Sequence, residues 1–356
     1  MRAQILKIDS SNPNPQDIHL AASFIKEGKI VCIPTETVYG LAINIYTPDS
    51  KERLNRLKKR DPSKPFSIAI YDKVLIDDFV FPLSTLAYKF IENFLPGPLT
   101  LIVKEPKENK LLGFRVPEHP VCRLILKAAG VPVYLTSVNV SGSKELVDVE
   151  QISREFGDYV DLIVESSSST IGQPSTVVKV EDNHFILLRE GPIKKEDLEK
   201  VKSIFYITFV CTGNSCRSVM AEFLFRKYLE VLKPHLKEKI VVSSCGLSSF
   251  EGMSASQETS ELLLKEENID VCGYKSRVCT PYHFKFQDLI LVMERYHLKR
   301  ITESYPYLKE KVFLLMDYAD ISNQDVEDPI SKDKEFYFKV FKQIKDAIIK
   351  IIEEKL

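Results

Sequence analysis

Short apolar runs alternate with amphipathic stretches through the first 200 residues of the chain. The short runs have the length and composition of strands, whereas the longer stretches repeat their apolar residues with the period of a helix. Strands are predicted at the N-terminus and at residues 29–33, 66–70, 100–103, 133–135, 162–164, 176–180 and 185–188, and helices at 15–26, 51–58, 84–94 and 121–129. This interleaving predicts a mixed α/β domain.

The second half begins with a near-continuous apolar run at residues 204–210, which is typical of a strand buried on both faces. Strand–helix units then repeat, with strands predicted at 240–244, 289–293 and 312–315, and helices at 219–232, 256–267, 296–305 and 334–354. This order predicts a small, doubly wound parallel sheet. A charged, helical connector at 194–202 separates the halves, so we predict domains at 1–200 and 203–356.

The last predicted helix carries Phe341, Ile344, Ile348 and Ile351 on one stripe. We expect this stripe to pack on its own sheet rather than to bind a membrane. No apolar run reaches the roughly 20 residues that a membrane helix needs, and the N-terminus lacks the apolar core of a signal peptide.

Composition narrows the class of protein further. A length of 356 residues suits two domains, and 49 basic against 50 acidic residues exclude a global basic field for nucleic acid. Seven cysteines form an odd set without an evident framework. That usage predicts a cytoplasmic protein with reduced thiols rather than a disulfide scaffold.

The most specific chemical pattern is Val-Cys-Thr-Gly-Asn-Ser-Cys-Arg-Ser at residues 210–218, between a predicted strand and a predicted helix. A helix N-terminus presents free N–H groups and attracts anions. Such a terminus and a nearby guanidinium both favour the thiolate form of a cysteine. We therefore expect Cys211 to be a nucleophile and Arg217 to bind two phosphoryl oxygens.

Other residues complete this chemistry. Gly213 permits the backbone angles of a tight loop, Asn214 can hold the loop through its side chain, and Ser218 can donate a hydrogen bond to the sulfur. Displacement at phosphorus also needs a proton donor for the leaving group. The candidate is Asp328, because the proline after it fixes a turn and loops converge at strand C-termini in open α/β sheets.

Residues 205–356 resemble the low-molecular-weight protein tyrosine phosphatase family. The motifs that carry the resemblance are this loop, Met-Ala-Glu at 220–222, Ser-Cys-Gly-Leu at 244–247, Leu-Ile-Leu-Val-Met-Glu at 289–294 and Glu-Asp-Pro at 327–329. The resemblance implies Cys211 as nucleophile, Arg217 as phosphate clamp and Asp328 as general acid, without a metal or cofactor. It implies a phosphate loop of Thr212, Gly213, Asn214, Ser215, Cys216 and Ser218, in which Cys216 forms a reversible disulfide on oxidation.

Two departures leave the substrate open between phosphotyrosine and other phosphomonoesters. Ile330 follows Asp-Pro where tyrosine phosphatases of this family usually carry an aromatic residue, although Phe250 could supply an aromatic wall. Ser215 is small and hydroxylic where the family's arginine phosphatases carry threonine, so phosphoarginine stays open. Arsenate reduction is disfavoured because no cysteine follows the 289–294 strand. An alternative for the second half is a redox-sensing module that switches through a Cys211–Cys216 disulfide. The presence of Arg217 and Asp328 argues against it, because redox sensing needs neither residue.

The first half contains neither a Walker A nor a Gly-x-Gly-x-x-Gly motif. Three polar blocks stand out instead, at residues 33–41, 58–66 and 136–142. Lys58, Arg60 and Lys64 lie in the cationic block and suit a triphosphate beside a small polar substrate. Composition alone favours a simpler interpretation, a solvated basic helix end with turns.

The order of the motifs favours an enzyme. Residues 5–200 resemble the YrdC family of threonylcarbamoyl-AMP synthases. The motifs that carry the resemblance are Pro-Thr-Glu-Thr-Val-Tyr-Gly-Leu at 34–41, Pro-Gly-Pro-Leu-Thr at 96–100, Arg-Val-Pro at 115–117, Ser-Val-Asn at 137–139, Pro-Ser-Thr-Val-Val at 174–178 and Arg-Glu-Gly at 189–191. The resemblance implies a twisted mixed sheet around a basic cavity. It also implies synthesis of threonylcarbamoyl-AMP from L-threonine, bicarbonate and ATP, with Mg²⁺ on the triphosphate.

By that resemblance, four residues line the threonine site: Thr37, Arg115, Ser137 and Ser175. Five others hold ATP: Lys58, Arg60, Lys64, Asn139 and Arg189. The implied partner is a transferase that moves the product to tRNA, which the chain would contact indirectly. Together the two resemblances predict a bifunctional cytoplasmic enzyme. The alternative for the first half is a module that binds RNA or nucleotide without catalysis.

Overall fold

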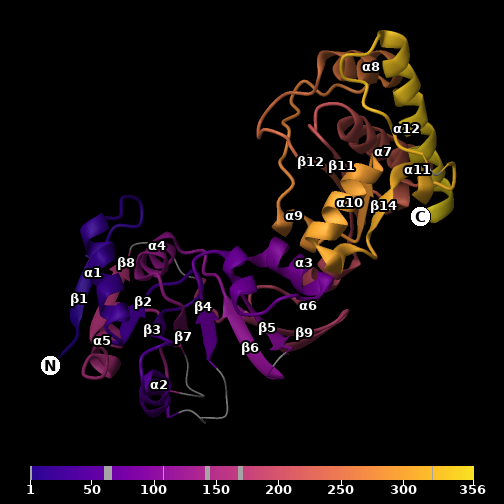
Figure 1. Ribbon diagram of the computed structural model, residues 1–356. Helices are drawn as coiled ribbons and strands as arrows, with labels where there is room; N and C mark the ends of the chain where they lie inside the picture. The colour runs from indigo at the N-terminus through magenta and orange to yellow at the C-terminus, as the bar shows by residue number, and fades with distance from the viewer. Residues whose placement is uncertain (1, 60–65, 107, 141–144, 167–170, 323) are drawn as a thin grey trace. The chain divides into compact units, whose positions relative to one another are not determined.

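A computed structural model describes residues 2–59, 66–106, 108–140, 145–166, 171–322 and 324–356. It divides into two compact units, Met1–Lys202 and Ser203–Leu356, which we describe separately (Figure 1). No helix among the described residues is long and apolar enough to cross a membrane.

Unit 1 is built on a ten-stranded mixed sheet with the strand order β1-β8-β2-β3-β7-β4-β6-β5-β9-β10. Its strands are β1 (Gln4–Ile8), β2 (Val31–Ile33), β3 (Gly40–Asn44), β4 (Ser67–Ala69), β5 (Leu99–Glu105), β6 (Lys110–Arg115), β7 (Val133–Ser137), β8 (Leu162–Ser166), β9 (Thr176–Glu181) and β10 (His184–Arg189). Its helices are α1 (Pro15–Lys26), α2 (Ser50–Lys58), α3 (Thr85–Phe94), α4 (Pro120–Ala129), α5 (Val149–Phe156) and α6 (Lys195–Ser203).

Helices cover both faces of this sheet because strand side chains alternate between them. Val31 and Ile33 on β2 pack with α1 and α4, whereas Cys32 packs on the opposite face with residues of α2 and α5. Helix α1 begins cleanly because the side chain of Asn14 accepts a hydrogen bond from the N–H of Gln16, with Pro15 in the first turn.

The predicted strands and helices of this unit are all present, and the mixed α/β fold is confirmed. Among the described residues, two strands and one α-helix were missed: β3, β6 and α5. All five residues of β3 are buried, but its sequence begins with a glycine inside a polar block. Strand β6 begins with exposed residues, so neither strand shows the alternation from which half-buried strands are recognised.

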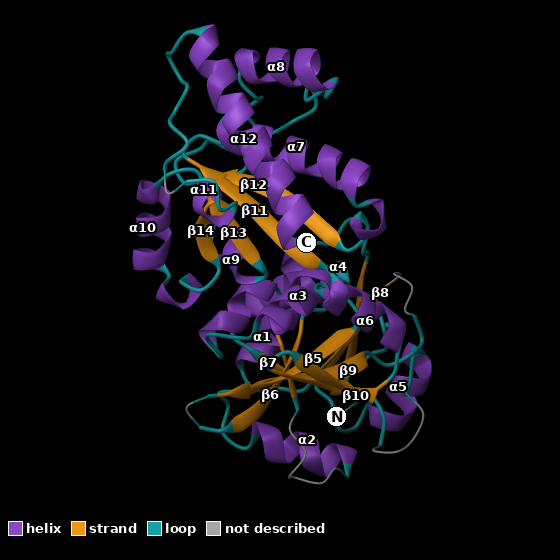
Figure 2. Cartoon of the chain, turned by 90° about the vertical axis from the view of Figure 1, so that its right-hand side faces the viewer, coloured by secondary structure: helices purple, strands orange, loops and turns teal. Residues whose placement is uncertain are grey.

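Unit 2 contains a four-stranded, all-parallel sheet in the order β12-β11-β13-β14, which confirms the predicted doubly wound fold (Figure 2). Its strands are β11 (Phe205–Cys211), β12 (Ile240–Gly246), β13 (Leu289–Val292) and β14 (Val312–Leu314). Its helices are α7 (Arg217–Leu232), α8 (Gln257–Glu267), α9 (Pro281–Lys285), α10 (Arg295–Ser304), α11 (Leu315–Tyr318) and α12 (Lys334–Lys355).

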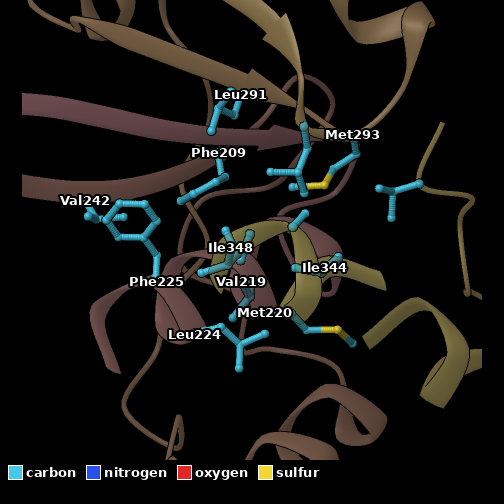
Figure 3. Close-up of a cluster of buried hydrophobic side chains, with 14 of the residues drawn as sticks. Phe209, Val219, Met220, Leu224, Phe225, Val242, Leu291, Met293, Ile344 and Ile348 are labelled. Carbon is cyan, nitrogen blue, oxygen red and sulfur yellow. The ribbon is translucent and has the colours of Figure 1, made fainter. Parts of the chain in front are cut away.

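The core of unit 2 explains why β11 is apolar throughout. Phe209 faces α7 and α12, whereas Val210 faces the other side of the sheet together with Ile301 of α10 (Figure 3). Ile344 and Ile348 of the final helix are fully buried in the first of these clusters, as are the other two residues of the predicted stripe. The expectation that this helix packs on its own sheet is confirmed.

The expectation of unpaired cysteines is wrong. Cys245, near the end of β12, forms a disulfide with Cys279, and their Cα atoms are 5.1 Å apart. Backbone hydrogen bonds bring the two segments together, because the N–H of Gly246 donates to Arg277 and the N–H of Cys279 donates to Gly246. This pairing depends on tertiary contacts, so the spacing of cysteines in the sequence did not indicate it.

We predict that Cys279→Ser lowers the free energy of unfolding of unit 2 by about 4 kcal/mol under non-reducing conditions. The two cysteines are 34 residues apart, and closing a loop of that size restricts the unfolded chain. Urea unfolding of the full chain measures the change. Cys272→Ser is the control, because Cys272 is exposed and unbridged; equal midpoints for both variants would contradict the prediction.

Candidate active sites

The 211–217 loop lies where β11 ends and α7 begins, so the predicted strand–loop–helix placement is present. The sulfur of Cys211 lies 3.0 Å from Oγ of Ser218 and accepts a hydrogen bond from the backbone N–H of Asn214 at 3.2 Å. Oγ of Ser218 itself accepts from Nδ2 of Asn214 at 2.9 Å, which leaves the serine proton free for the sulfur. Two hydrogen-bond donors are therefore directed at the sulfur of Cys211.

The loop turns at Asn214 and not at Gly213. Asn214 has φ of 51°, in the left-handed region, whereas Gly213 does not have a positive φ. The expected backbone role of Gly213 is therefore wrong. Asparagine tolerates this conformation because its short polar side chain forms local hydrogen bonds.

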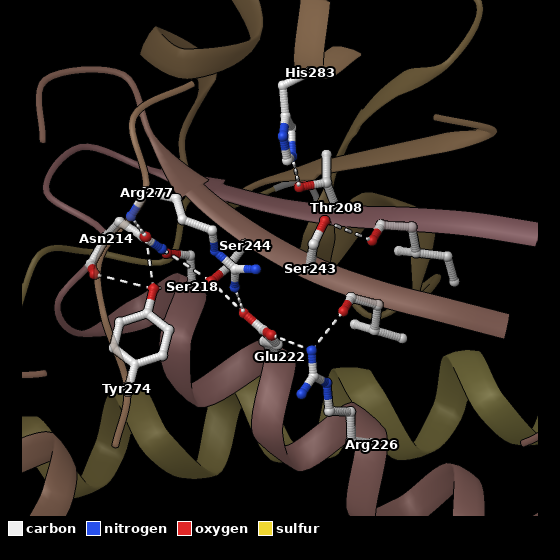
Figure 4. Close-up of polar contacts among 12 residues, drawn as sticks. Thr208, Asn214, Ser218, Glu222, Arg226, Ser243, Ser244, Tyr274, Arg277 and His283 are labelled. Carbon is white, nitrogen blue, oxygen red and sulfur yellow. Dashed lines mark hydrogen bonds and ion pairs between the residues drawn. The ribbon is translucent and has the colours of Figure 1, made fainter. Parts of the chain in front are cut away.

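Several residues that the sequence did not indicate hold the side chain of Asn214 (Figure 4). Its Oδ1 accepts hydrogen bonds from the hydroxyl of Tyr274 at 2.6 Å and the backbone N–H of Arg277 at 2.7 Å. Burial raises the pKa of Tyr274, so its hydroxyl stays protonated. With its oxygen fixed in this way, Asn214 must direct Nδ2 toward Ser218 and Ser244.

A buried carboxylate anchors the far side of this network. Glu222 on α7 accepts a hydrogen bond from Oγ of Ser244 at 2.6 Å and pairs with Arg277 at 2.6 Å. Arg226, one turn further along the helix, also pairs with Glu222 (Figure 4). The sequence signal was the acid in Met-Ala-Glu, an uncommon residue for a buried helix face.

Arg217 is 1% exposed, and three oxygen atoms contact its guanidinium. Nη1 donates to the carbonyl of Val326 at 2.8 Å and pairs with Oε2 of Glu294 at 2.9 Å. Nη2 pairs with Oδ2 of Asp328. The structure therefore brings Arg217 and Asp328 together as expected, and it adds Glu294, which the sequence analysis did not identify.

The remaining loop residues surround this centre. Sγ of Cys216 is buried, 3.1 Å from the hydroxyl of Tyr337 and 3.3 Å from Oγ of Ser256. The reversible Cys211–Cys216 disulfide stays a prediction, since both thiols are free here. Phe250 and Ile330 are 80% and 52% exposed, so both are available to contact a substrate.

Gly246 at the end of β12 allows the loop to approach the sheet closely. A Cβ atom at this position would lie 2.7 Å from the carbonyl oxygen of Thr212 and 2.9 Å from the backbone nitrogen of Asn214. Neither atom can move without moving the loop. Glycine is thus required here by space rather than by its backbone angles.

In unit 1, four of the nine predicted substrate residues line one cavity. Arg115, Ser137, Ser175 and Arg189 line it, together with Val38, Phe66, Ser67, Thr100, Ile102, Gly113, Leu135, Thr136, Pro174 and Val177. Thr37 is buried, and its hydroxyl oxygen accepts a hydrogen bond from Nη2 of Arg115. Arg189 donates to the carbonyl and the hydroxyl of Ser175, at 3.0 and 3.3 Å.

Arg115 is one of two arginines that line this cavity, and the other is Arg189. Nη2 of Arg115 donates to Oε1 of Glu36 at 2.9 Å and to Oγ1 of Thr35 at 3.1 Å. Its Nε is buried and has no hydrogen-bond partner among the described residues. A buried donor without a partner is costly, so this atom suits an acceptor supplied by a ligand.

Lys58 and Asn139 meet at the end of β7. Nζ of Lys58 donates to Oδ1 of Asn139 at 2.7 Å and to its carbonyl at 2.9 Å. Oγ of Ser137 also donates to Oδ1 of Asn139, at 2.8 Å, which connects this pair to the cavity. Arg60 and Lys64 lie outside the described residues.

Comparisons with known proteins find a matching family for each unit. A model of the Sua5/YciO/YrdC family, described as "Telomere recombination", matches residues 23–191. A "Putative threonylcarbamoyl-AMP synthase" of Methanocaldococcus jannaschii is 32% identical, and the match covers 55% of this chain and 97% of that protein. The chain belongs to the Sua5/YciO/YrdC family.

A second family model, "Low molecular weight phosphotyrosine protein phosphatase", matches residues 206–356, so unit 2 is a domain of that type. The threonylcarbamoyl-AMP synthase of Bacillus subtilis is 30% identical over the matched residues. The match covers 54% of this chain and 58% of that protein. Among solved structures, Escherichia coli YciO has 27% identity and a TM-score of 0.51, covering 55% of this chain and 99% of its own.

We predict that Gly246→Ala lowers kcat/KM for p-nitrophenyl phosphate at least tenfold, because the new methyl group displaces the 211–217 loop by contact with its backbone. The assay is steady-state phosphate release by the full chain. Gly273→Ala is the matched control, since a Cβ there meets no atom within 4 Å. Equal activity of the two variants would refute the steric argument.

Proposed function

We propose that unit 1 synthesises threonylcarbamoyl-AMP from L-threonine, bicarbonate and ATP, with release of pyrophosphate. The observation that carries this proposal is the cavity in which Arg115 lies among serine and threonine hydroxyls. The buried Nε of Arg115 has no hydrogen-bond partner among the described residues. A guanidinium binds a carboxylate through two parallel hydrogen bonds, so Arg115 suits the carboxylate of threonine. The hydroxyl of Ser137 or Ser175 would bind its polar groups.

The ATP side of this reaction depends on positioning and charge. Arg189 would contact phosphate or adenylate at the cavity wall, while Lys58, Asn139, Arg60 and Lys64 would hold the triphosphate. The described residues include no group of three or more His, Cys, Asp or Glu side chains that could hold a metal ion. We expect Mg²⁺ to arrive with ATP, held by phosphate oxygens.

For unit 2 we infer hydrolysis of phosphomonoesters through Cys211. Its thiolate forms a bond to phosphorus as the ester P–O bond breaks, and Asp328 donates a proton to the leaving oxygen. Water then attacks phosphorus and gives a proton to the Asp328 carboxylate as the S–P bond breaks, so that phosphate and the thiolate are released. Two oxygens of the phosphoryl group would replace Asp328 on the guanidinium of Arg217, and Asp328 would take up a proton from solvent before it acts as the acid.

The partners proposed for the full chain follow from these reactions. The adenylate product of unit 1 would pass to a transferase that modifies tRNA, and the chain would meet tRNA through that enzyme. Unit 2 would act on a phosphoprotein or another phosphomonoester, and both activities are expected in the cytoplasm.

The synthase proposal predicts that pyrophosphate release from ATP requires both threonine and bicarbonate. Arg115→Lys should raise KM for threonine at least tenfold, since lysine cannot form the paired hydrogen bonds of a guanidinium. Arg154→Ala is the control, because Arg154 is an exposed residue of α5. ATP binding without turnover in the wild-type protein would instead support a nucleotide-binding module.

For unit 2, phosphate release from matched phosphotyrosine and phosphoarginine peptides should disappear in Cys211→Ser and persist in Cys272→Ser. Preference for phosphotyrosine would give Phe250 the role of substrate wall, because Ile330 cannot stack on a ring. Preference for phosphoarginine would assign selection to Ser215. Turnover of neither peptide nor p-nitrophenyl phosphate would contradict the phosphatase proposal.

A further inference from the structure

His297, in the first turn of α10, is fully buried at 0% exposure beside the 211–217 loop. Its Nδ1 accepts a hydrogen bond from the backbone N–H of Glu294 at 3.2 Å. Its Nε2 lies 2.9 Å from Oγ1 of Thr212 and 3.4 Å from Oε2 of Glu294. One imidazole thus contacts the residue after the nucleophile and the carboxylate that pairs with Arg217.

The hydrogen bond from Glu294 determines where the imidazole carries its proton. A neutral ring has one donor and one acceptor nitrogen. Since Nδ1 accepts from the backbone, the proton lies on Nε2, which donates toward Thr212. Burial, reinforced by the charge of Arg217, lowers the pKa of His297 to about 4, so the ring is neutral near neutral pH.

The two residues that His297 contacts, Thr212 and Glu294, both adjoin the candidate catalytic groups. Thr212 directly follows Cys211, and its carbonyl also accepts the N–H of Ser248 at 2.9 Å. Glu294 holds Nη1 of Arg217 at 2.9 Å. Because Thr212 and Glu294 come from loops after different strands, β11 and β13, a group between them fixes the spacing of the two loops.

We propose that His297 is a positioning residue of the phosphatase site, which holds Thr212 at the start of the loop and orients Glu294 toward Arg217. This inference rests on the proposed activity of unit 2. It differs from a purely structural role, because the ring nitrogen that caps α10 is Nδ1, whereas the nitrogen that reaches the loop is Nε2.

Two substitutions separate these nitrogens. The amide of asparagine ends near the position of Nδ1, so His297→Asn retains an acceptor for the N–H of Glu294 but does not reach Thr212. The amide of glutamine extends toward the position of Nε2, so His297→Gln retains a donor for Thr212. The matched variant on the loop is Thr212→Val, which removes the hydroxyl with little change of shape.

The experiment measures kcat and KM for p-nitrophenyl phosphate, the dissociation constant of orthophosphate, and the unfolding midpoint, all with the full chain. We expect His297→Asn to lower kcat/KM and weaken phosphate binding by roughly tenfold, as for loss of one hydrogen bond. We expect His297→Gln to stay within about threefold of wild type. Thr212→Val should add little to His297→Asn, because both remove the same contact.

The inference is overturned if His297→Asn keeps wild-type kcat/KM and phosphate affinity, if both His297 variants lose activity equally with a lowered midpoint, or if the Thr212→Val effect is additive. Failure of the proposed activity is a separate result, recognised by wild-type protein that does not hydrolyse the ester. In that case the phosphate affinities of the same variants still decide whether His297 positions the loop.

Discussion

Each unit of this protein buries a guanidinium at its candidate site, and neighbouring carboxylates and a carbonyl pair with that positive charge. Arg115 is 8% exposed and Arg217 is 1% exposed. Arginine cannot lose its proton at physiological pH, so a buried guanidinium must be paired with carboxylates or carbonyls. Glu36 meets this requirement in unit 1, and Glu294, Asp328 and the carbonyl of Val326 meet it in unit 2.

The same pairing prepares both cations for anionic ligands. In unit 1, Glu36 pairs with Nη2 of Arg115, and no described residue accepts a hydrogen bond from the buried Nε. In unit 2, Asp328 is the more exposed of the two carboxylates on Arg217 and the one that an incoming phosphoryl group would displace.

The sequence predicted what is local. Long amphipathic helices such as α1, α7 and α12 follow from periodicity, whereas the short helices α5, α9 and α11 were not predicted. The 211–218 loop is contiguous, so its strand–loop–helix placement and the contact of Ser218 with Cys211 could be predicted. Pairing of Arg217 with Asp328 required the further rule that loops converge at strand C-termini in parallel sheets.

What the sequence missed depends on contacts between distant segments. Tyr274, Arg277 and His297 are ordinary residues in the sequence, and they matter because the parallel sheet brings their segments to one edge. The Cys245–Cys279 disulfide has the same origin. Gly213 was expected to carry the tight turn, but Asn214 does so, because a network of side chains stabilises its left-handed conformation.

The most direct test of this account is orthophosphate binding to Cys211→Ser with and without Asp328→Asn, measured by calorimetry at neutral pH. If Asp328 occupies Arg217 until an oxyanion replaces it, removal of the competing carboxylate should tighten phosphate binding severalfold. Unchanged or weaker binding would contradict the account, because it would show that the Arg217–Asp328 pair does not stand in the place of the substrate.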